Sequence, residues 1–369
     1  MEPIMTLRTA RSFLSLFLLP VCIVCSTDYS ALAQTLQVAD ASSLKAAVGT
    51  LRDGNTLQIA AGDYPGGFTV KNIKDLTIEA TDTNHPPNFI GGNFAWHFSS
   101  CPGLKLQYLR VTGQTGNGIN IDDGGHADHP VAGVTLKHLE IGDIGPRGNT
   151  DGIKCSGLDD LSIHNCSLSG WGGQAIDMVG CHRVLISECD FAGKEGFAQD
   201  SGIQCKGGSE HIRIENCQFE NAGQRPINVG GSTSMPYFRP IGAKFEARDV
   251  VIQRNIIKGS PCACAFVGVD SATFAQNEIL FPEKWVFRIL QETNDAGFIA
   301  CRNVTIEDNS IVFLRSQVSI EVNIGANTRP DTFQFKKNRW FAEDHPDRSR
   351  PTLPNEESDG VYGADPRIK

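Results

Sequence analysis

One short phrase recurs along the chain and limits the folds available to it. The phrase is apolar, any residue, apolar, two residues, Asn or Cys, any residue, apolar. Its clearest copies read LSIHNCSL from Leu161, VLISECDF from Val184 and IRIENCQF from Ile212. The second apolar position advances by 27, 23 and 28 residues, from 136 to 163, 186 and 214. Alternation with period two predicts a strand with one buried face, and repetition at this interval indicates a solenoid.

Stacked copies of this strand would bury one continuous core, which a single copy cannot do alone. Further copies place Asn255, Asn309 and Asn338 at the Asn or Cys position, and weaker copies begin at Leu76, Leu104, Val134 and Ala272. The sequence therefore predicts an all-β fold, a single-stranded right-handed parallel β-helix of about ten coils. Residues 42–51 have apolar residues at helical spacing after a serine that can cap, which predicts a short helix covering the first coil.

The beginning of the chain has the features of a secretory signal peptide. Arg8 and Arg11 precede an apolar run over 13–25, and Ala31-Leu-Ala33 follows it. No later segment is apolar enough for a membrane span. We therefore expect residues 1–33 to be a signal peptide, 34–341 to form the β-helix with its N-terminal cap, and 342–369 to be an extended tail. The mature protein is expected to be secreted or periplasmic.

The repeat also bears on the cysteines. Cys166, Cys189 and Cys217 occupy the Asn or Cys position on successive coils, where we interpret them as small core residues. Cys155 and Cys205 share an inward column but lie two coils apart, ~9.6 Å, which is too far for a disulfide. Four others leave their pairing open: Cys101, Cys262, Cys264 and Cys301.

A second phrase defines a polar strip on one sheet. It repeats at Ile119, Ile153, Ile176, Ile203 and Ile227, and the residues alternating with its apolar positions face solvent. One outward column reads Asn120, Lys154, Asp177, Gln204 and Asn228, and the next reads Asp122, Ser156, Val179, Lys206 and Gly230. Neighbours in a column are ~4.8 Å apart, so Lys154 beside Asp177 predicts an ion pair. Lys206 has no acidic neighbour in its own column.

The strip and a neighbouring insertion contain residue types suited to an acidic sugar. Arg225 lies at the entrance of the strand after Lys206, and a lysine near another cation can have its pKa lowered toward that of a useful base. The insertion at 230–249 carries an aromatic pair beside an arginine, which suits stacking on sugar rings and pairing with an acid group. The expected substrate-binding residues are Lys154, Asp177, Gln204, Asn228, Tyr237, Arg239 and Arg288.

The stretch DSGIQCK ending at Lys206, followed by NAGQRPINVG over 221–230, resembles the polysaccharide lyase family that contains alginate lyases and chondroitinase B, within the pectate-lyase-like superfamily. The resemblance implies that Lys206 is the base that abstracts the C5 proton of a uronate and that Arg225 is the acid. A calcium ion commonly neutralises the uronate carboxylate in that family, and Asp200 is the candidate ligand here. Alignment of the repeats places Gly230, not Arg225, in the column of Lys206.

Two other functions remain open. The motif Asn149-Thr-Asp151-Gly-Ile153 resembles the first motif of polygalacturonase-like glycoside hydrolases, in which Asp151, Asp177 and Asp200 would supply carboxylates ~6.5–9.5 Å apart. The third hypothesis is a non-catalytic carbohydrate-binding or cell-surface β-helix. The net charge of −9 argues against a general nucleic-acid binder but permits a local basic groove. The preferred hypothesis is a lyase whose partner is an acidic polysaccharide.

Overall fold

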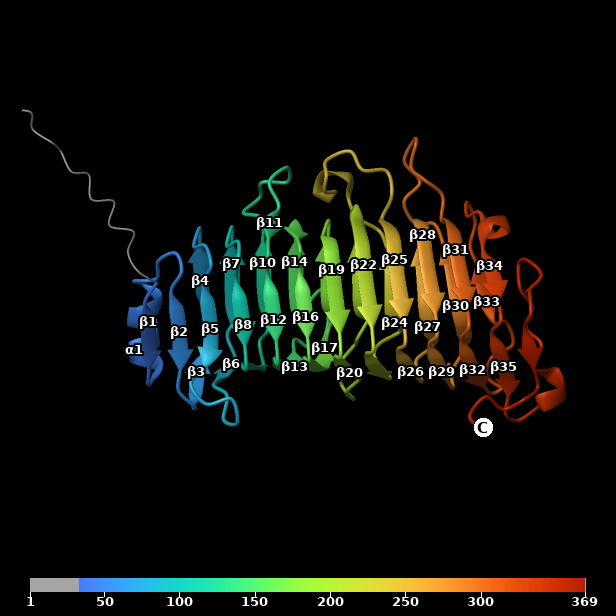
Figure 1. The fold of residues 1–369 in the computed structure, drawn as a ribbon, viewed down its shortest axis with the longest axis horizontal. Helices are drawn as coiled ribbons and strands as arrows, with labels where there is room; N and C mark the ends of the chain where they lie inside the picture. Colours follow the sequence, from blue (N-terminus) through green and yellow to red (C-terminus); the bar gives the residue numbers. More distant parts are fainter. Residues whose placement is uncertain (1–32, 369) are drawn as a thin grey trace, which may run out of the picture. The chain divides into compact units, whose positions relative to one another are not determined.

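Each copy of the repeated phrase forms a strand that pairs in parallel register with the copies before and after it. The computed structural model describes residues 33–368, and in it the coils follow one another in sequence order (Figure 1). The second apolar position pairs from coil to coil through Leu136, Ile163, Ile186, Ile214, Ile252, Phe274, Ile306 and Phe335. The predicted parallel β-helix is confirmed.

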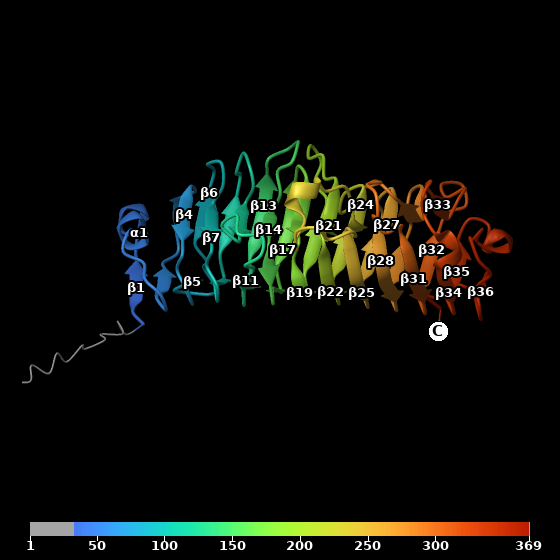
Figure 2. The same ribbon diagram turned by 90° about the horizontal axis from the view of Figure 1, so that it is seen from above.

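Three parallel sheets run along the stack (Figure 2). Sheet 1 contains β1 (Thr35–Val38), β2 (Thr56–Ile59), β5 (Thr77–Ala80), β8 (Lys105–Gln107), β11 (Val131–Ala132), β12 (Thr135–Lys137), β15 (Leu158–Asp159), β16 (Ser162–His164), β19 (His182–Ser187), β22 (Ser209–Glu215), β25 (Ala247–Gln253), β28 (Val269–Ala275), β31 (Arg302–Glu307) and β34 (Gln334–Lys336). Sheet 2 contains β4 (Phe68–Lys71), β7 (Trp96–Ser99), β10 (Ile119–Asp122), β14 (Ile153–Ser156), β18 (Gln174–Val179), β21 (Ser201–Lys206), β24 (Arg225–Gly230), β27 (Cys262–Val267), β30 (Trp285–Leu290) and β33 (Val322–Ile324). Sheet 3 contains β3 (Asp63–Pro65), β6 (Asn88–Ile90), β9 (Arg110–Thr112), β13 (Glu140–Ile144), β17 (Ser167–Trp171), β20 (Asp190–Ala192), β23 (Gln218–Glu220), β26 (Ile256–Lys258), β29 (Glu278–Leu280), β32 (Ser310–Phe313), β35 (Arg339–Ala342) and β36 (Val361–Tyr362).

Helical structure in the described chain is limited to short segments. These are α1 (Ala41–Val48) and the 3₁₀ helices η1 (Met235–Tyr237), η2 (Pro330–Thr332) and η3 (Pro346–Arg348). None of the helices within 33–368 has the length and apolar character needed to cross a bilayer. The second repeated phrase forms sheet 2, where Ile119, Ile153, Ile176, Ile203 and Ile227 pair in register and are buried.

The Asn or Cys position of the repeat forms a continuous ladder inside the turn between sheets 1 and 3. Its members are Cys166, Cys189, Cys217, Asn255, Asn277, Asn309 and Asn338, all buried. Each asparagine accepts a hydrogen bond from the backbone N–H of the preceding member, at 2.9 to 3.1 Å. The ladder satisfies turn amides that burial removes from water. Its three cysteines are free thiols, as predicted, and the other seven cysteines of 33–368 are also free and buried.

Truncating the ladder at its centre is expected to destabilise the fold strongly. Asn309 donates to Phe274 O at 3.0 Å and to Asn338 Oδ1 at 2.8 Å, and it accepts the N–H of Asn277. Asn309→Ala should therefore lower the free energy of unfolding by about 2–4 kcal/mol, because several buried groups lose their partners. Urea unfolding measures the change. The exposed Asn84 is the control, and Asn84→Ala should change stability by less than about 0.5 kcal/mol.

The two ends of the stack are closed in different ways. Helix α1 follows β1, and its N-cap is Asp40 rather than the predicted serine; Ser43 instead completes the capping box. At the other end, β36 of the tail pairs with β35, and Glu357 accepts the N–H of Asn338 at 3.1 Å, which continues the ladder. The tail after residue 341 thus packs on the last coil. The predicted signal peptide lies outside the described residues, apart from Ala33.

Candidate functional site

A pocket of about 430 Å³ opens on sheet 2 over the predicted polar strip. The strands supply its floor, because outward residues of neighbouring coils lie side by side. The loop between β24 and β25 supplies one wall. The pocket is lined by Asn149, Lys154, Ser156, Asp177, Val179, Lys206, Ser232, Thr233, Ser234, Tyr237 and Arg239. Five of the predicted site residues therefore meet here: Lys154, Asp177, Lys206, Tyr237 and Arg239.

Two lysines share one buried carboxylate on the pocket floor. Lys154 Nζ donates to Asp177 Oδ2 at 2.6 Å, which confirms the predicted ion pair, and also to Asp151 Oδ2 at 2.8 Å. Lys206 Nζ lies 3.0 Å from Asp177 Oδ1 and donates to Gln204 Oε1 at 3.2 Å. The interpretation of Lys206 as a lysine without an acidic neighbour is therefore incomplete. The carboxylate that Lys206 contacts belongs to Asp177, which lies on the preceding coil in the neighbouring column. A comparison of residues within one column does not reveal this diagonal neighbour.

The charges in this cluster differ in how fully they are paired. Burial disfavours the charged form of Lys154, but the adjacent Asp177 and Asp151 raise its pKa above its ordinary value. Burial and the neighbouring charge of Asp177 raise the pKa of Asp151, and Lys154 opposes this shift. Asp177 Oδ1 accepts no hydrogen bond from the described residues, so Lys206 contacts it as an ion pair without hydrogen-bond geometry. Of the two lysines, Lys206 therefore has the weaker set of ion pairs and hydrogen bonds.

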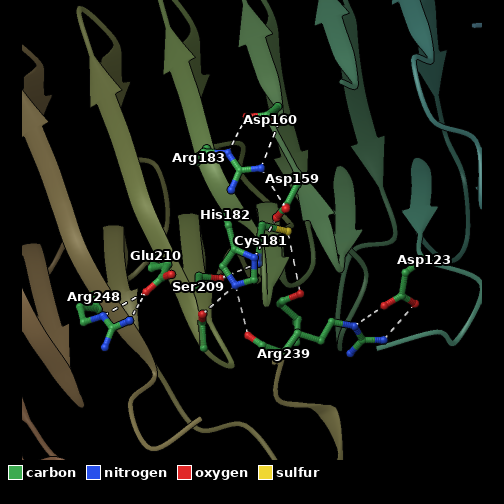
Figure 3. A network of polar contacts seen from close by, with 12 residues as sticks. Asp123, Asp159, Asp160, Cys181, His182, Arg183, Ser209, Glu210, Arg239 and Arg248 are labelled. Carbon is green, nitrogen blue, oxygen red and sulfur yellow. Dashed lines mark hydrogen bonds and ion pairs between the residues drawn. The ribbon is translucent and has the colours of Figure 1, made fainter. Parts of the chain in front are cut away.

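Arg239 forms the pocket wall and is held by the chain itself. Its guanidinium donates to both oxygens of Asp123, from Nε at 2.5 Å and from Nη2 at 3.1 Å, across 116 residues of sequence (Figure 3). The side chain passes over Gly180, where an added Cβ would lie 2.3 Å from Arg239 Cβ, so this crossing requires glycine. Arg239 was expected to pair with an acid group of the substrate; in the structure its guanidinium pairs with Asp123 of the chain itself.

His182 fastens the same loop from behind the wall. Its Nδ1 lies 2.9 Å from Asp159 Oδ1, and its Nε2 lies 3.2 Å from Gly208 O and 3.3 Å from Arg239 O (Figure 3). The backbone of Arg239 is also held at its N–H, which donates to Gly207 O at 2.9 Å. Tyr237, two residues before Arg239, is 62% exposed and lines the pocket. These contacts of the loop backbone hold its aromatic ring at the pocket wall.

Glu246 ties three segments around the pocket together. It is fully buried and accepts hydrogen bonds from Gly207 N, Thr233 N, Thr233 Oγ1 and Thr293 Oγ1, at 2.7 to 2.9 Å. Burial raises the pKa of this carboxyl, and the hydrogen bonds from Gly207, Thr293 and Thr233 oppose the shift. Gly207 follows Lys206, and Thr233 lines the pocket. Sequence reasoning missed Glu246 because it lies in an insertion without periodicity.

Four predicted binding or catalytic residues lie outside the pocket. Gln204 and Asn228 face outward as predicted but are buried, and Gln204 Nε2 donates to Gly230 O at 3.0 Å. Arg225 pairs in register with Ser201, five residues before Lys206, which corresponds to roughly 16 Å along the strand. Lys206 faces Asp177 on the preceding coil, whereas Arg225 faces Glu292, beyond β30. Arg225 and Arg288 together form a second cluster further along sheet 2.

The carboxylates named in the calcium and hydrolase hypotheses lie in different surroundings. Asp200 is exposed at the entrance of β21, with Gln174 Nε2 at 3.4 Å. Calcium takes six to eight oxygen ligands, and residues 33–368 contain no cluster of three or more acidic, His or Cys side chains suited to a metal. Asp151 and Asp177 are buried, and Lys154 binds one oxygen of each, at 2.8 and 2.6 Å. Those oxygens are too close for the ~6.5 Å or more of inverting hydrolysis.

Comparison with known proteins places the chain among β-helices. The family model described as "Right handed beta helix region" matches residues 94–279. The structure of an alginate lyase from Paenibacillus sp. str. FPU-7 is similar, with a TM-score of 0.53 and 21% identity over 79% of this chain and 97% of that one. The catalytic unit of a GH87 alpha-1,3-glucanase from Streptomyces thermodiastaticus gives a TM-score of 0.60 at 13% identity, over 90% of this chain and 68% of that one. An endo-xylogalacturonan hydrolase from Aspergillus tubingensis gives 0.52 at 11% identity, over 89% of this chain and 100% of that one. No curated protein matches, and these identities establish a shared fold alone.

Proposed function

Because the chain belongs to the right-handed β-helix family, a fold that it shares with solved polysaccharide lyases and glycoside hydrolases, we propose that it is an exported polysaccharide lyase. Its substrate would be a uronate-containing polysaccharide, and Lys206 would be the base. The similar structures include proteins named for alginate and xylogalacturonan, which supports this choice of substrate class. Fold alone does not assign chemistry, and the residues of the pocket support the proposal.

The observation that carries the proposal is the state of Lys206 relative to the other cations of the pocket. Lys154 binds two carboxylates, and Arg239 binds both oxygens of one. Lys206 makes one ion pair without hydrogen-bond geometry and one hydrogen bond to a neutral amide. Its ammonium or amine is thus the basic group that an incoming uronate can meet. Proton abstraction needs such a group within hydrogen-bond reach of the substrate.

The proposed step is a β-elimination with two proton transfers. The free amine of Lys206 takes the C5 proton, the C–H electrons form the C4=C5 bond, and the bond from C4 to the glycosidic oxygen breaks. Tyr237, which lines the same pocket, donates its phenolic proton to that oxygen. Tyr237 replaces Arg225 in this role because Arg225 does not line the pocket.

Replacing Lys206 tests the proposal. The wild-type protein, mixed with alginate, chondroitin, pectate and heparin-type polymers, is expected to produce the ultraviolet absorbance of an unsaturated uronate with at least one of them. Lys206→Ala should lower the rate about 10²–10⁴-fold, because a general base contributes an effect of this size. Parallel assays with calcium and with a chelator test the expected calcium dependence.

The control and the contrary outcomes are well defined. Lys258 lies on sheet 3 and pairs with Glu220 at 2.8 Å, so Lys258→Ala should retain full activity. New reducing ends without ultraviolet absorbance would replace elimination with hydrolysis. Binding of polymer without any cleavage would support the non-catalytic alternative. Full activity of Lys206→Ala would remove Lys206 as the base.

A further inference from the structure

We propose that Arg225, Arg288 and Trp285 form a separate subsite that binds a carboxylate of an acidic polysaccharide. The subsite lies on sheet 2, and β30 is three coils beyond β21, so it is roughly 14 Å along the stack from the Lys206 pocket. It deepens the proposed function and rests on it for the nature of the polymer, although binding at the subsite does not require cleavage.

The two arginines are incompletely neutralised by the chain. Arg225 Nη1 lies 3.9 Å from Glu292 Oε1, which is at the limit of an ion pair. Arg288 Nε donates to a neutral group, Asn323 Oδ1, at 3.1 Å. Burial, and after it the nearby charge of Arg225, lower the pKa of Arg288, and Glu292 opposes this shift. An added carboxylate would relieve the repulsion between the two positive charges.

The surroundings of the arginines suit a sugar acid. Arg288 lies over the ring of Trp285 at 4.6 Å, and Lys284 lies over the same ring at 4.3 Å. Stacking of this kind holds the guanidinium in place, and it leaves hydrogen-bond donors for a planar, bidentate partner. In the outward column of sheet 2, Ala265 lies between Asn228 and Arg288. The sheet surface between these two residues therefore carries only a methyl group. Asn228 Oδ1 is buried and has no partner among residues 33–368, which leaves a polar atom at the other side of this surface.

A charged ligand fits this cluster better than a neutral one. The whole chain carries a net charge of −9, so two arginines whose one ion pair, to Glu292, is 3.9 Å long are a departure from the average surface. Carboxylate recognition by arginine is bidentate and charge-assisted, whereas a neutral sugar would leave the repulsion unrelieved. The same groove therefore offers a base at one position and a carboxylate clamp at another.

Trp285 provides a built-in reporter for the subsite. The chain has four tryptophans, and three of them, Trp96, Trp171 and Trp340, are at most 1% exposed. Trp285 is half-buried beside the arginines, so a bound ligand is expected to change its fluorescence alone. The probes are an alginate oligosaccharide and its carboxyl-reduced form, which has the same length and no charge. The Lys206→Ala protein is used so that the oligosaccharide stays intact.

The alginate oligosaccharide should change the fluorescence with saturation, and the carboxyl-reduced form should bind at least tenfold more weakly. Arg225→Gln and Arg288→Gln should each weaken binding about tenfold or more, because each removes a charge-assisted pair. Arg213, on sheet 1, supplies the control, and Arg213→Gln should bind as well as its parent. Trp285→Phe should abolish the signal while calorimetry still detects binding.

Two outcomes would overturn the subsite: equal affinity for the charged and the reduced oligosaccharide, or unchanged affinity in both arginine variants. Failure of the proposed function is distinguishable from either. Charge-dependent binding at Trp285 without cleavage by the wild type would leave the subsite in place and remove the lyase. Cleavage that depends on Lys206, with binding indifferent to Arg225 and Arg288, would do the reverse.

Discussion

Lys154→Met is expected to lower the free energy of unfolding by about 3–5 kcal/mol at neutral pH, because it leaves two buried carboxylates without their shared cation. Asp151 and Asp177 are 0% and 1% exposed, and Lys154 lies within 2.8 Å of both. Methionine is unbranched and only one atom shorter than lysine, so the loss reports mainly the charge and its hydrogen bonds. Urea unfolding of the purified variant measures it.

The same variant has a definite pH dependence. The pKa of Asp151 is already raised by burial and by Asp177, and Lys154 opposes this shift, so removing Lys154 should raise it further. A carboxyl with a raised pKa in the folded state binds its proton more tightly there than in the unfolded chain. Stability is therefore gained below the ordinary value of 3.8 and lost as pH rises through the folded pKa.

The destabilisation by Lys154→Met should consequently be smaller at mildly acidic pH than at pH 8. Adding Asp151→Asn to Lys154→Met should recover part of the loss, because it removes the carboxylate whose ion pair Lys154 supplied, whereas Asp177 keeps Lys206 at 3.0 Å. A loss that is the same at both pH values and unchanged in the double variant would show that packing, and not charge, is responsible.

Glu246→Gln is expected to destabilise the protein by about 3 kcal/mol and to lower turnover about tenfold to a hundredfold. Both oxygens of Glu246 accept backbone N–H groups, one from Gly207 and the other from Thr233. Glutamine has one oxygen and one NH₂ group, so either orientation sets a donor against a backbone donor. Gly207 and Thr233 should then shift, and the Lys206 pocket with them.

Thermal unfolding and the ultraviolet assay measure the two effects on Glu246→Gln. Glu220 is an exposed glutamate on sheet 3, and Glu220→Gln should leave both quantities near their wild-type values. Unaltered stability would mean that Glu246 is not the anchor of the three segments. Reduced stability with unaltered turnover would mean that its anchoring does not extend to the pocket.

The registers of the coils could be predicted from the sequence because a slip of one residue would turn every apolar side chain outward. The pairing of Lys154 with Asp177 followed from the same argument, since both lie in one outward column. The contact of Lys206 with Asp177 could not be predicted in this way, because the two residues lie in neighbouring columns and the register does not fix the direction of a long side chain. The access of Gln204 and Asn228 to solvent was also misjudged, because an outward position says nothing about what covers it.

The sequence by itself determined the parallel β-helix, the register of its strands and the thiol and asparagine ladder. These follow from the repeated phrase, because only one register of the stacked coils buries all of its apolar residues. Tertiary structure alone decided the other polar contacts around the pocket, beyond the Lys154–Asp177 pair that the register predicted. Arg239 reaches Asp123 across 116 residues, and Glu246 joins three segments, through loops that have no repeat. A loop's path depends on its own packing and hydrogen bonds, so no spacing in the sequence encodes these contacts.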